Sequence, residues 1–367
     1  MSLARSLSFA KMAWSVVSSI GANQLGLEAT PKMAHLMLSW KCNLKCLMCS
    51  VWKKERFKQA RTSDFLRLID NLPNLDVVKI SGGEPFLRTD CAEIVAHLQK
   101  RHNPYCITII SNGTMTAPMV EFAQRCGRPG LHLRLSLEGR GSVHDKLRGC
   151  PGCFDKTMAT LKALLPIMRQ RRFTIGINYN VNSETIKDLP WILDLCRREK
   201  LNFIPGFWVT PFLEPGRPED SRALIDNMED FRRRLENIYR QNEGFSFLEA
   251  FLLKRTVLGL YDQAIQSCGD KRFACRANRN ILYVMPDGSL VTCGIRQEVL
   301  GNLMFQSFAD IWQSEKMCQA RKIVDSCSGC CQYSLKIMSK LYNGEIFALP
   351  APYAWRKLEA SCNSKRE

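Results

Sequence analysis

The chain has 367 residues, of which 46% are hydrophobic, so it can bury a substantial core, and long disordered parts are not expected. Its formal net charge of +17 favours anionic partners but does not choose among acidic proteins, phosphorylated molecules, lipid surfaces and nucleic acid. The 17 cysteines are unevenly placed, with clusters at 42–49 and 327–331, which argues against a small secreted disulfide scaffold and favours metal ligation in a reducing compartment.

The amino-terminal segment, residues 1–30, carries apolar side chains at helical spacing, among them Trp14 and Val17, with Arg5 and Lys11 off that stripe. We expect an amphipathic helix packed on the protein's own core. The alternative is a helix on a membrane surface, which the tryptophan and the basic residues favour. There is no run of about 20 apolar residues and no clean signal peptide, so we expect a cytoplasmic protein, with peripheral membrane contact as the variant.

From 35 to 210, short apolar runs alternate with longer helical patterns. Strands are predicted at 35–40, 76–81, 107–111, 131–136, 173–181 and 202–209. Helices are predicted between them at 63–72, 91–100, 117–126, 155–171 and 184–198. Six strands separated by helices indicate an α/β fold with a parallel sheet and right-handed crossovers.

A loop rich in proline and glycine is predicted to leave the sheet at 210–220, and two helical patterns follow it. The composition changes at about residue 265, beyond which a PDG turn between apolar alternations predicts a hairpin. We therefore divide the chain into an amino-terminal helix (1–30), a core (31–215), a helical linker (216–266), a small α+β domain with cysteines (267–335), and a carboxyl-terminal helix with a basic tail (336–367).

The most informative stretch is CNLKCLMC, which places Cys42, Cys46 and Cys49 in a C-x3-C-x2-C array. Thiolates are preferred ligands of iron in iron–sulfur clusters, and three ligands from one loop leave the fourth iron open to a substrate or cofactor. The motif GGEP, at 82–85, follows the predicted strand 76–81. Its two glycines allow a ligand to approach the backbone closely.

Together, the cysteine array and GGEP resemble the radical S-adenosylmethionine (radical SAM) enzymes. The resemblance implies a partial (β/α)6 TIM-type barrel with a [4Fe-4S] cluster on Cys42, Cys46 and Cys49. It further implies S-adenosylmethionine on the open iron and a flavodoxin- or ferredoxin-type electron donor. Reductive cleavage would give a 5′-deoxyadenosyl radical that abstracts hydrogen from an unactivated C–H bond. Nucleic acid is not an expected partner.

The same resemblance assigns contacts to S-adenosylmethionine. Met48 matches the position that packs on the adenine, and Gly83 and Glu84 match those that receive the ammonium group. Softer matches follow the later strands, where Glu138 stands in place of the more usual aspartate. For these softer matches, loop capping or a structural hydrogen bond is the competing interpretation. The predicted cofactor-binding residues are Met48, Gly82, Gly83, Glu84, Ser111, Asn112, Ser136, Arg148 and Asn178.

A second set of cysteines lies in the small domain predicted at 267–335. A long-spaced pair followed by a CxxC after a helix can supply four thiolates to one cluster and leave no open iron. The block resembles the SPASM/twitch extension of radical SAM enzymes, and the shortened, single-cluster twitch form fits the cysteine count better. A structural zinc site is the alternative. The predicted ligands are Cys275, Cys293, Cys327 and Cys330, with Cys331 as a substitute for Cys330.

The residues do not identify the substrate. The amino-terminal helix and the aromatic side chains near 347–355 favour a lipid-like or other small-molecule biosynthetic intermediate. The alternatives within the family are a peptide (RiPP) maturase and a radical alcohol dehydrogenase of the SPASM/twitch group. A non-catalytic iron–sulfur protein for electron transfer or regulation is the alternative from another class, and it would leave GGEP without a role.

Overall fold

The structure is a computed structural model, and it describes residues 14–22, 24–25, 30–53, 58–181, 184–207, 274–327, 338–339 and 341–343. The predicted linker at 216–266 and most of the predicted tail lie outside these residues, as do Cys330 and Cys331. No helix in the described part is both long and apolar enough to cross a membrane.

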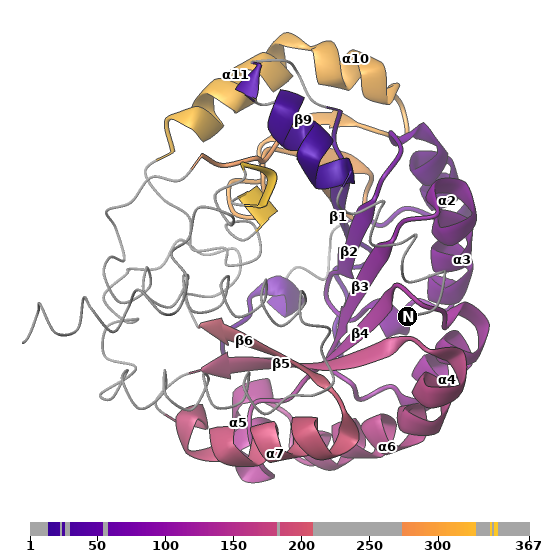
Figure 1. The fold of residues 1–367 in the computed structure, drawn as a ribbon, viewed down its shortest axis with the longest axis vertical. Helices are drawn as coiled ribbons and strands as arrows, with labels where there is room; N and C mark the ends of the chain where they lie inside the picture. Colours follow the sequence, from indigo (N-terminus) through magenta and orange to yellow (C-terminus); the bar gives the residue numbers. More distant parts are fainter. Residues whose placement is uncertain are drawn as a thin grey trace, which may run out of the picture.

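A curved sheet forms the centre of the protein, with the strand order β6-β5-β4-β3-β2-β1-β7-β8-β9 (Figure 1). Its first six strands in chain order pair in parallel, which confirms the prediction. They are β1 (Met33–Met37), β2 (Val77–Ser81), β3 (Cys106–Ser111), β4 (Leu131–Ser136), β5 (Thr174–Val181) and β6 (Asn202–Phe207). The first strand covers 33–37 instead of 35–40, because the chain leaves the sheet early to form the cysteine loop.

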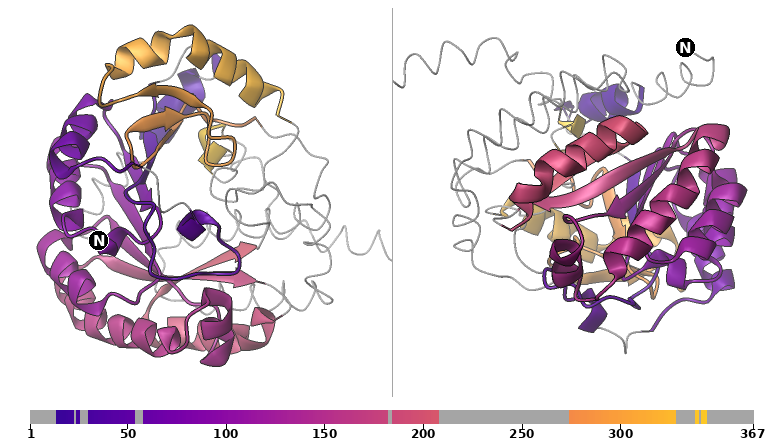
Figure 2. Two further views of the ribbon diagram at one scale, coloured as in Figure 1. Left: turned by 180° about the vertical axis from the view of Figure 1, so that it is seen from behind. Right: turned by 90° about the horizontal axis from the view of Figure 1, so that it is seen from below.

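Helices cover the outer face of this sheet (Figures 1 and 2). The predicted helices are α2 (Thr62–Asn71), α3 (Cys91–His102), α4 (Thr116–Cys126), α6 (Cys153–Arg171) and α7 (Leu189–Glu199). Short 3-10 turns add η1 (Val51–Lys53), η2 (Pro85–Leu87) and η3 (Thr185–Asp188). A further helix, α5 (Ser142–Arg148), is absent from the prediction because its seven residues are too few to show a helical period. Gly141 and Gly149 bound it, both with positive φ.

Alternation along the strands separates the two faces of the sheet. On the outer face Leu36, Ile80, Ile109 and Leu133 are fully buried, and they form the main core with helix residues such as Phe122. The residues between them point to the inside of the curve. The carboxyl ends of the six parallel strands meet at one edge, and the loops that carry the predicted site residues leave from that edge.

The carboxyl-terminal part extends the same sheet. β7 (Ile281–Val284) pairs in parallel with β1, and the hairpin of β7 with β8 (Ser289–Val291) forms at the predicted PDG turn, where Gly288 has φ +82°. β9 (Val299–Asn302) follows, and then α10 (Phe308–Gln313) and α11 (Glu315–Asp325). The expected domain boundary near residue 265 lies outside the described residues and stays a prediction.

The amino-terminal segment is helical over 14–22. Val16 is buried, whereas Trp14 is 74% exposed and Val17 is 59% exposed. Trp14 and Val17, the described members of the apolar stripe, therefore face away from the protein's own core. The prediction that the helix packs on the core through this stripe is not met by these two residues.

Candidate active site at the carboxyl ends of the strands

The predicted cluster loop follows β1 directly and brings its three thiols together. Cys46 is buried, Cys42 and Cys49 are half-buried, and all three pack with Leu44 and Met48 in one small cluster. Burial raises the pKa of the Cys42 thiol to about 12, and the two neighbouring thiols act in the same direction. Burial also raises the pKa of Cys49. These thiols would lose their protons on binding iron, and their mutual repulsion as anions is what a cationic cluster would relieve.

Helix α5 supports this loop from one side. The Leu47 amide donates to the carbonyl oxygen of Leu147 at 3.0 Å. At the end of the helix, a Cβ on Gly149 would lie 2.4 Å from the Lys45 carbonyl oxygen, so a glycine is required for the helix to approach the loop this closely.

An arginine connects the same helix to a cysteine ligand. Arg148 Nη1 lies 3.7 Å from Cys46 Sγ, and Nη2 donates to the fully buried carboxylate of Glu138. Burial opposes the charge of Arg148, but Glu138 and Cys46 outweigh that effect and raise the pKa of the guanidinium above its ordinary value. Donors aimed at cluster sulfurs tune iron–sulfur centres.

The sequence shows Glu138 in place of the more usual aspartate, but it does not show which groups this side chain contacts. Its carboxylate also accepts from the Asn180 amide at 2.7 Å and from Asn180 Nδ2 at 3.0 Å. The one signal for this arrangement in the sequence is an acidic residue two positions after a buried strand and ten positions before an arginine. The predicted contact of Arg148 with S-adenosylmethionine stays a prediction.

The two glycines of GGEP fix the distance to the cysteine loop. The Gly83 amide donates to the Ser39 carbonyl oxygen at 2.6 Å. A Cβ on Gly82 would lie 2.4 Å from that oxygen, and one on Gly83 would lie 2.0 Å from the Lys41 carbonyl oxygen. The close approach that the glycines allow is therefore made to the loop itself, and it holds the two predicted cofactor-binding segments together.

Glu84 is fully buried and joins the ends of β2 and β3. Its Oε1 accepts from Ser111 Oγ at 2.9 Å and from the Phe86 amide at 3.1 Å, and its Oε2 accepts from the Asn112 amide at 2.7 Å. Burial raises the pKa of Glu84 to about 7, although these donors oppose the shift. The Asn112 side chain donates to Asn43 Oδ1 at 2.8 Å, which continues the connection to the cysteine loop.

The remaining predicted contacts lie at the same edge. Ser136 is buried at the end of β4, in register with the half-buried Asn178 of β5. Met48 is half-buried in the cysteine loop. Seven of the nine predicted cofactor-binding residues thus lie on the loops and strand ends that follow β1 to β4, while Arg148 ends α5 and Asn178 lies within β5. Their contact with S-adenosylmethionine stays a prediction.

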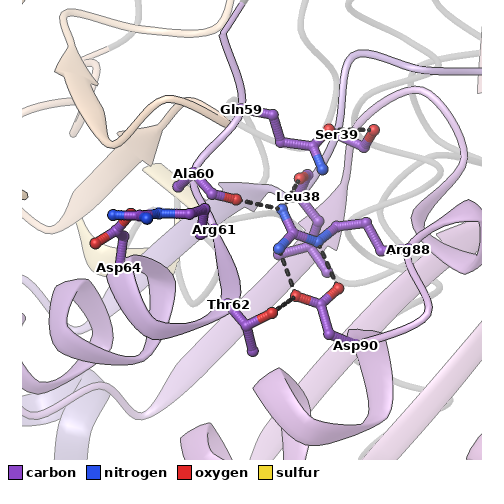
Figure 3. A network of polar contacts seen from close by, with 9 residues as sticks. All are labelled: Leu38, Ser39, Gln59, Ala60, Arg61, Thr62, Asp64, Arg88 and Asp90. Atoms are coloured by element: carbon purple, nitrogen blue, oxygen red, sulfur yellow. Dashed lines mark hydrogen bonds and ion pairs between the residues drawn. The ribbon is translucent and has the colours of Figure 1, made fainter.

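A buried arginine next to GGEP secures these strand ends (Figure 3). Arg88 Nη1 donates to the carbonyl oxygens of Leu38 at 3.0 Å and Ala60 at 3.1 Å, and Arg88 forms a bidentate pair with Asp90. Thr62 donates to the same carboxylate at 2.6 Å. The network therefore fixes the segment after β1 to the segment before α2, and charge-assisted bonds of this kind are the stronger class.

The second cysteine set meets beside β7 and β8. Cys275 and Cys293 pack against the same hydrophobic cluster. Burial raises the pKa of the Cys275 thiol, and the thiols of Cys293 and Cys327 act on it in the same direction. The Arg296 amide donates to Cys293 Sγ at 3.4 Å. The fourth predicted ligand, Cys330 or Cys331, lies outside the described residues.

A structural zinc ion, the alternative for this second set, would draw its thiolates to about 2.3 Å from one centre. Among the described residues, no three His, Cys, Asp or Glu side chains converge closely enough to hold a single metal ion, and the fourth predicted ligand lies outside these residues.

Comparison with known proteins agrees with both halves of this description. Residues 38–196 match the Radical SAM superfamily, and residues 275–331 match an iron–sulfur cluster-binding domain, SPASM. The Fe-coproporphyrin III synthase of Methanosarcina barkeri (strain Fusaro / DSM 804) is 31% identical over 166 residues, which cover 44% of this chain and 40% of that protein. The AdoMet-dependent heme synthase of the same organism is 23% identical over 330 residues, covering 84% of this chain and 90% of that protein.

The fold also matches a solved structure, native anSMEcpe with bound AdoMet and Cp18Cys peptide. The TM-score is 0.59 at 17% identity, and the match covers 92% of this chain and 100% of that one. The partial barrel with a carboxyl-terminal cluster domain is therefore confirmed as the fold. The non-catalytic alternative is set aside, because the related proteins are enzymes.

The donor set fits the implied groups: three thiols on one loop, a glycine cradle packed against that loop, and a second set of thiols in the carboxyl-terminal domain. Residues 38–196 therefore form a radical SAM domain and residues 275–331 a SPASM-type cluster-binding domain, in an enzyme that works with a [4Fe-4S] cluster, S-adenosylmethionine and an auxiliary iron–sulfur centre.

Proposed function

We propose that this enzyme abstracts a hydrogen atom from a C–H bond of a small organic substrate held inside the partial barrel. The observation that carries the proposal is the joining of the Cys42, Cys46 and Cys49 loop to GGEP by backbone contacts at the carboxyl edge of the sheet. With the cofactors bound, one electron from a flavodoxin- or ferredoxin-type donor cleaves S-adenosylmethionine to methionine and a 5′-deoxyadenosyl radical, which takes the hydrogen atom.

The protein's own residues hold and shield this centre. Cys42, Cys46 and Cys49 would be the cluster ligands, and Gly83 and Glu84 would lie beside the ammonium group of the cofactor. Cys275, Cys293 and Cys327, with Cys330 or Cys331, would hold the auxiliary cluster. An auxiliary cluster that accepts the electron left on the substrate would make the reaction a net oxidation.

For the substrate, we favour a small-molecule biosynthetic intermediate with an apolar, lipid-like body. Two proteins similar to this chain are an Fe-coproporphyrin III synthase and an AdoMet-dependent heme synthase. Both names describe small-molecule products. A peptide is the second candidate, because a solved structure of the same fold contains a bound peptide.

Peripheral contact with a membrane would bring a lipid-like substrate to the enzyme. The exposed Trp14 and Val17 support it, together with Arg5 and Lys11 nearby in the sequence. We expect the full chain to float with anionic liposomes and a variant with Trp14→Ser and Val17→Ser to float less. Equal flotation of the two proteins would contradict this contact.

Anaerobic reconstitution tests the central proposal. With dithionite and S-adenosylmethionine, the reconstituted protein should release 5′-deoxyadenosine, measured by chromatography and mass spectrometry. Cys46→Ala should abolish release and lower the iron content by about four per chain. Cys318→Ala, on an exposed position of α11, is the matched control and should change neither quantity. Product from the Cys46 variant, or none from the unaltered protein, would contradict the proposal.

A further inference from the structure

The turn between α5 and α6 carries a CxxC sequence, residues 150–153, that lies outside both predicted sets of cluster ligands. The Cys153 amide donates to the Cys150 carbonyl oxygen at 3.3 Å, and Gly152 has φ 73° and ψ 7°. With Pro151 before that glycine, these values define a type II β-turn, which brings its first and last Cα atoms within about 7 Å. Disulfides join Cα atoms about 4.4–6.8 Å apart, so the turn holds two free thiols within bridging range.

The same turn packs against the cysteine loop of the proposed cluster site. Cys153 is fully buried and Cys150 is half-buried, and both belong to the small hydrophobic cluster that contains Cys46. Gly149, the residue before the turn, lies against the backbone of Lys45. A disulfide between residues 150 and 153 would therefore form next to the predicted cluster ligands and would use none of them.

A carboxylate lies next to the buried thiol. Cys153 Sγ donates to Asp145 Oδ1 at 3.3 Å, so the sulfur carries its proton in this contact. The Gly152 amide donates to the same carboxylate at 2.6 Å and the Phe154 amide at 2.8 Å, and these two bonds hold it at the start of α6. A base within hydrogen-bond reach of a thiol is the arrangement that activates a sulfur nucleophile.

We propose that Cys150 and Cys153 form a reversible dithiol–disulfide couple, with Asp145 as the base for Cys153. A CxxC at the start of a helix in a strand–helix–strand unit is typical of redox-active thiols. Its oxidant would be a small disulfide such as oxidised glutathione. The couple is independent of the proposed function, because it involves neither the clusters nor S-adenosylmethionine.

The reaction would proceed by two thiol–disulfide exchanges. The thiolate of Cys150, the more exposed of the two, attacks oxidised glutathione, and one glutathione thiolate leaves. The sulfur of Cys153 then attacks the sulfur of Cys150, its proton passes to Asp145, and the second glutathione leaves. The two cysteines lose two electrons and two protons in total, and one glutathione disulfide becomes two glutathione thiols.

The test is a thiol titration of the anaerobically reconstituted enzyme. Mixtures of reduced and oxidised glutathione set the potential, free thiols are trapped by alkylation, and mass spectrometry follows the peptide that contains residues 150–153. We expect one transition that removes two hydrogen atoms from this peptide. Cys153→Ser should accumulate a mixed disulfide of Cys150 with glutathione, whereas Cys150→Ser should leave Cys153 reduced, because that thiol is fully buried.

Asp145→Asn separates proton transfer from the support of the turn. An asparagine oxygen still accepts a hydrogen bond from an amide at this position but takes no proton from the thiol. The mixed disulfide on Cys150 should therefore persist about ten times longer than in the unaltered protein. Cys318, which is exposed on α11, is the control thiol, and its reaction with oxidised glutathione should proceed at the same rate in both proteins.

Three results would overturn the inference. The first is a pair that stays reduced in every glutathione mixture, and the second is a Cys153→Ser protein without the mixed disulfide. The third is a loss of about four irons per chain in either cysteine variant, since residues 150 and 153 would then be cluster ligands. An unchanged lifetime of the mixed disulfide in Asp145→Asn would overturn the role of that carboxylate.

Discussion

Removing the charge of Glu138 should destabilise the protein more than any single change at its surface ion pairs. Glu138→Gln keeps the size of the side chain but leaves Arg148 buried next to Cys46 without its carboxylate partner. The backbone amide and the side chain of Asn180 both donate hydrogen bonds to this carboxylate. In the glutamine variant, the side-chain NH2 group would face one of these donors instead of accepting from it. Breaking one side of a buried ion pair costs about 3–5 kcal/mol.

This cost can be read as a change in melting temperature. Unfolding carries about 2 cal/mol/K of entropy per residue, or roughly 0.8 kcal/mol/K for a chain of 367 residues. A loss of about 3–5 kcal/mol should then lower the melting temperature by roughly 4–7 °C. Circular dichroism of the anaerobically reconstituted protein measures this shift.

A matched control separates burial from charge. Glu184 pairs with Lys146 at 2.8 Å, but the side chains are 48% and 61% exposed. Glu184→Gln should therefore change the melting temperature by less than about 1 °C, because exposed pairs contribute little. If Glu138→Gln melts within about 1 °C of the Glu184 variant, the buried pair is not the support that the geometry indicates.

Two further changes follow from the same geometry. Gly83→Ala places a Cβ 2.0 Å from a carbonyl oxygen of the cysteine loop, so it should lower the free energy of unfolding by about 1–3 kcal/mol and weaken S-adenosylmethionine binding measured by calorimetry. Gly21→Ala is the control, because its Cβ would meet no atom within 4 Å, and it should change neither quantity. Cys275→Ala should lower the iron content by about four per chain while leaving 5′-deoxyadenosine release by the first cluster intact, and an unchanged iron count would remove Cys275 from the ligand set.

The sequence predicted the parts of this fold that have a local signal. Alternating apolar residues identified the six parallel strands, and PDG identified the hairpin, because a turn and its flanking strands are adjacent in the chain. The cysteine array and GGEP were found separately, yet their contact through Ser39 and Lys41 follows only from the pairing of β1 with β2.

Features that depend on the pairing of strands far apart in the chain could not be predicted from the sequence. β7 joins β1 across more than two hundred residues, so nothing in the local pattern showed that the carboxyl-terminal part continues the barrel sheet. The contacts of Glu84 are of the same kind. Glu84 and Asn112 are 28 residues apart in the chain, and the pairing of β2 with β3 is what brings that carboxylate to the Asn112 amide.

Two buried carboxylates connect the segments of the site to one another. Glu84 and Glu138 are fully buried just beyond the ends of β2 and β4, at the edge where the cofactor is proposed to bind. Glu84 accepts hydrogen bonds from groups that follow β3, and Glu138 accepts from Arg148 on α5 and from the backbone of β5. Arg148 in turn lies 3.7 Å from the sulfur of Cys46, so the connection continues to the cysteine loop. The loss of either carboxylate should therefore be felt at the cluster loop as well as at its own strand, because each one joins neighbouring segments of this edge.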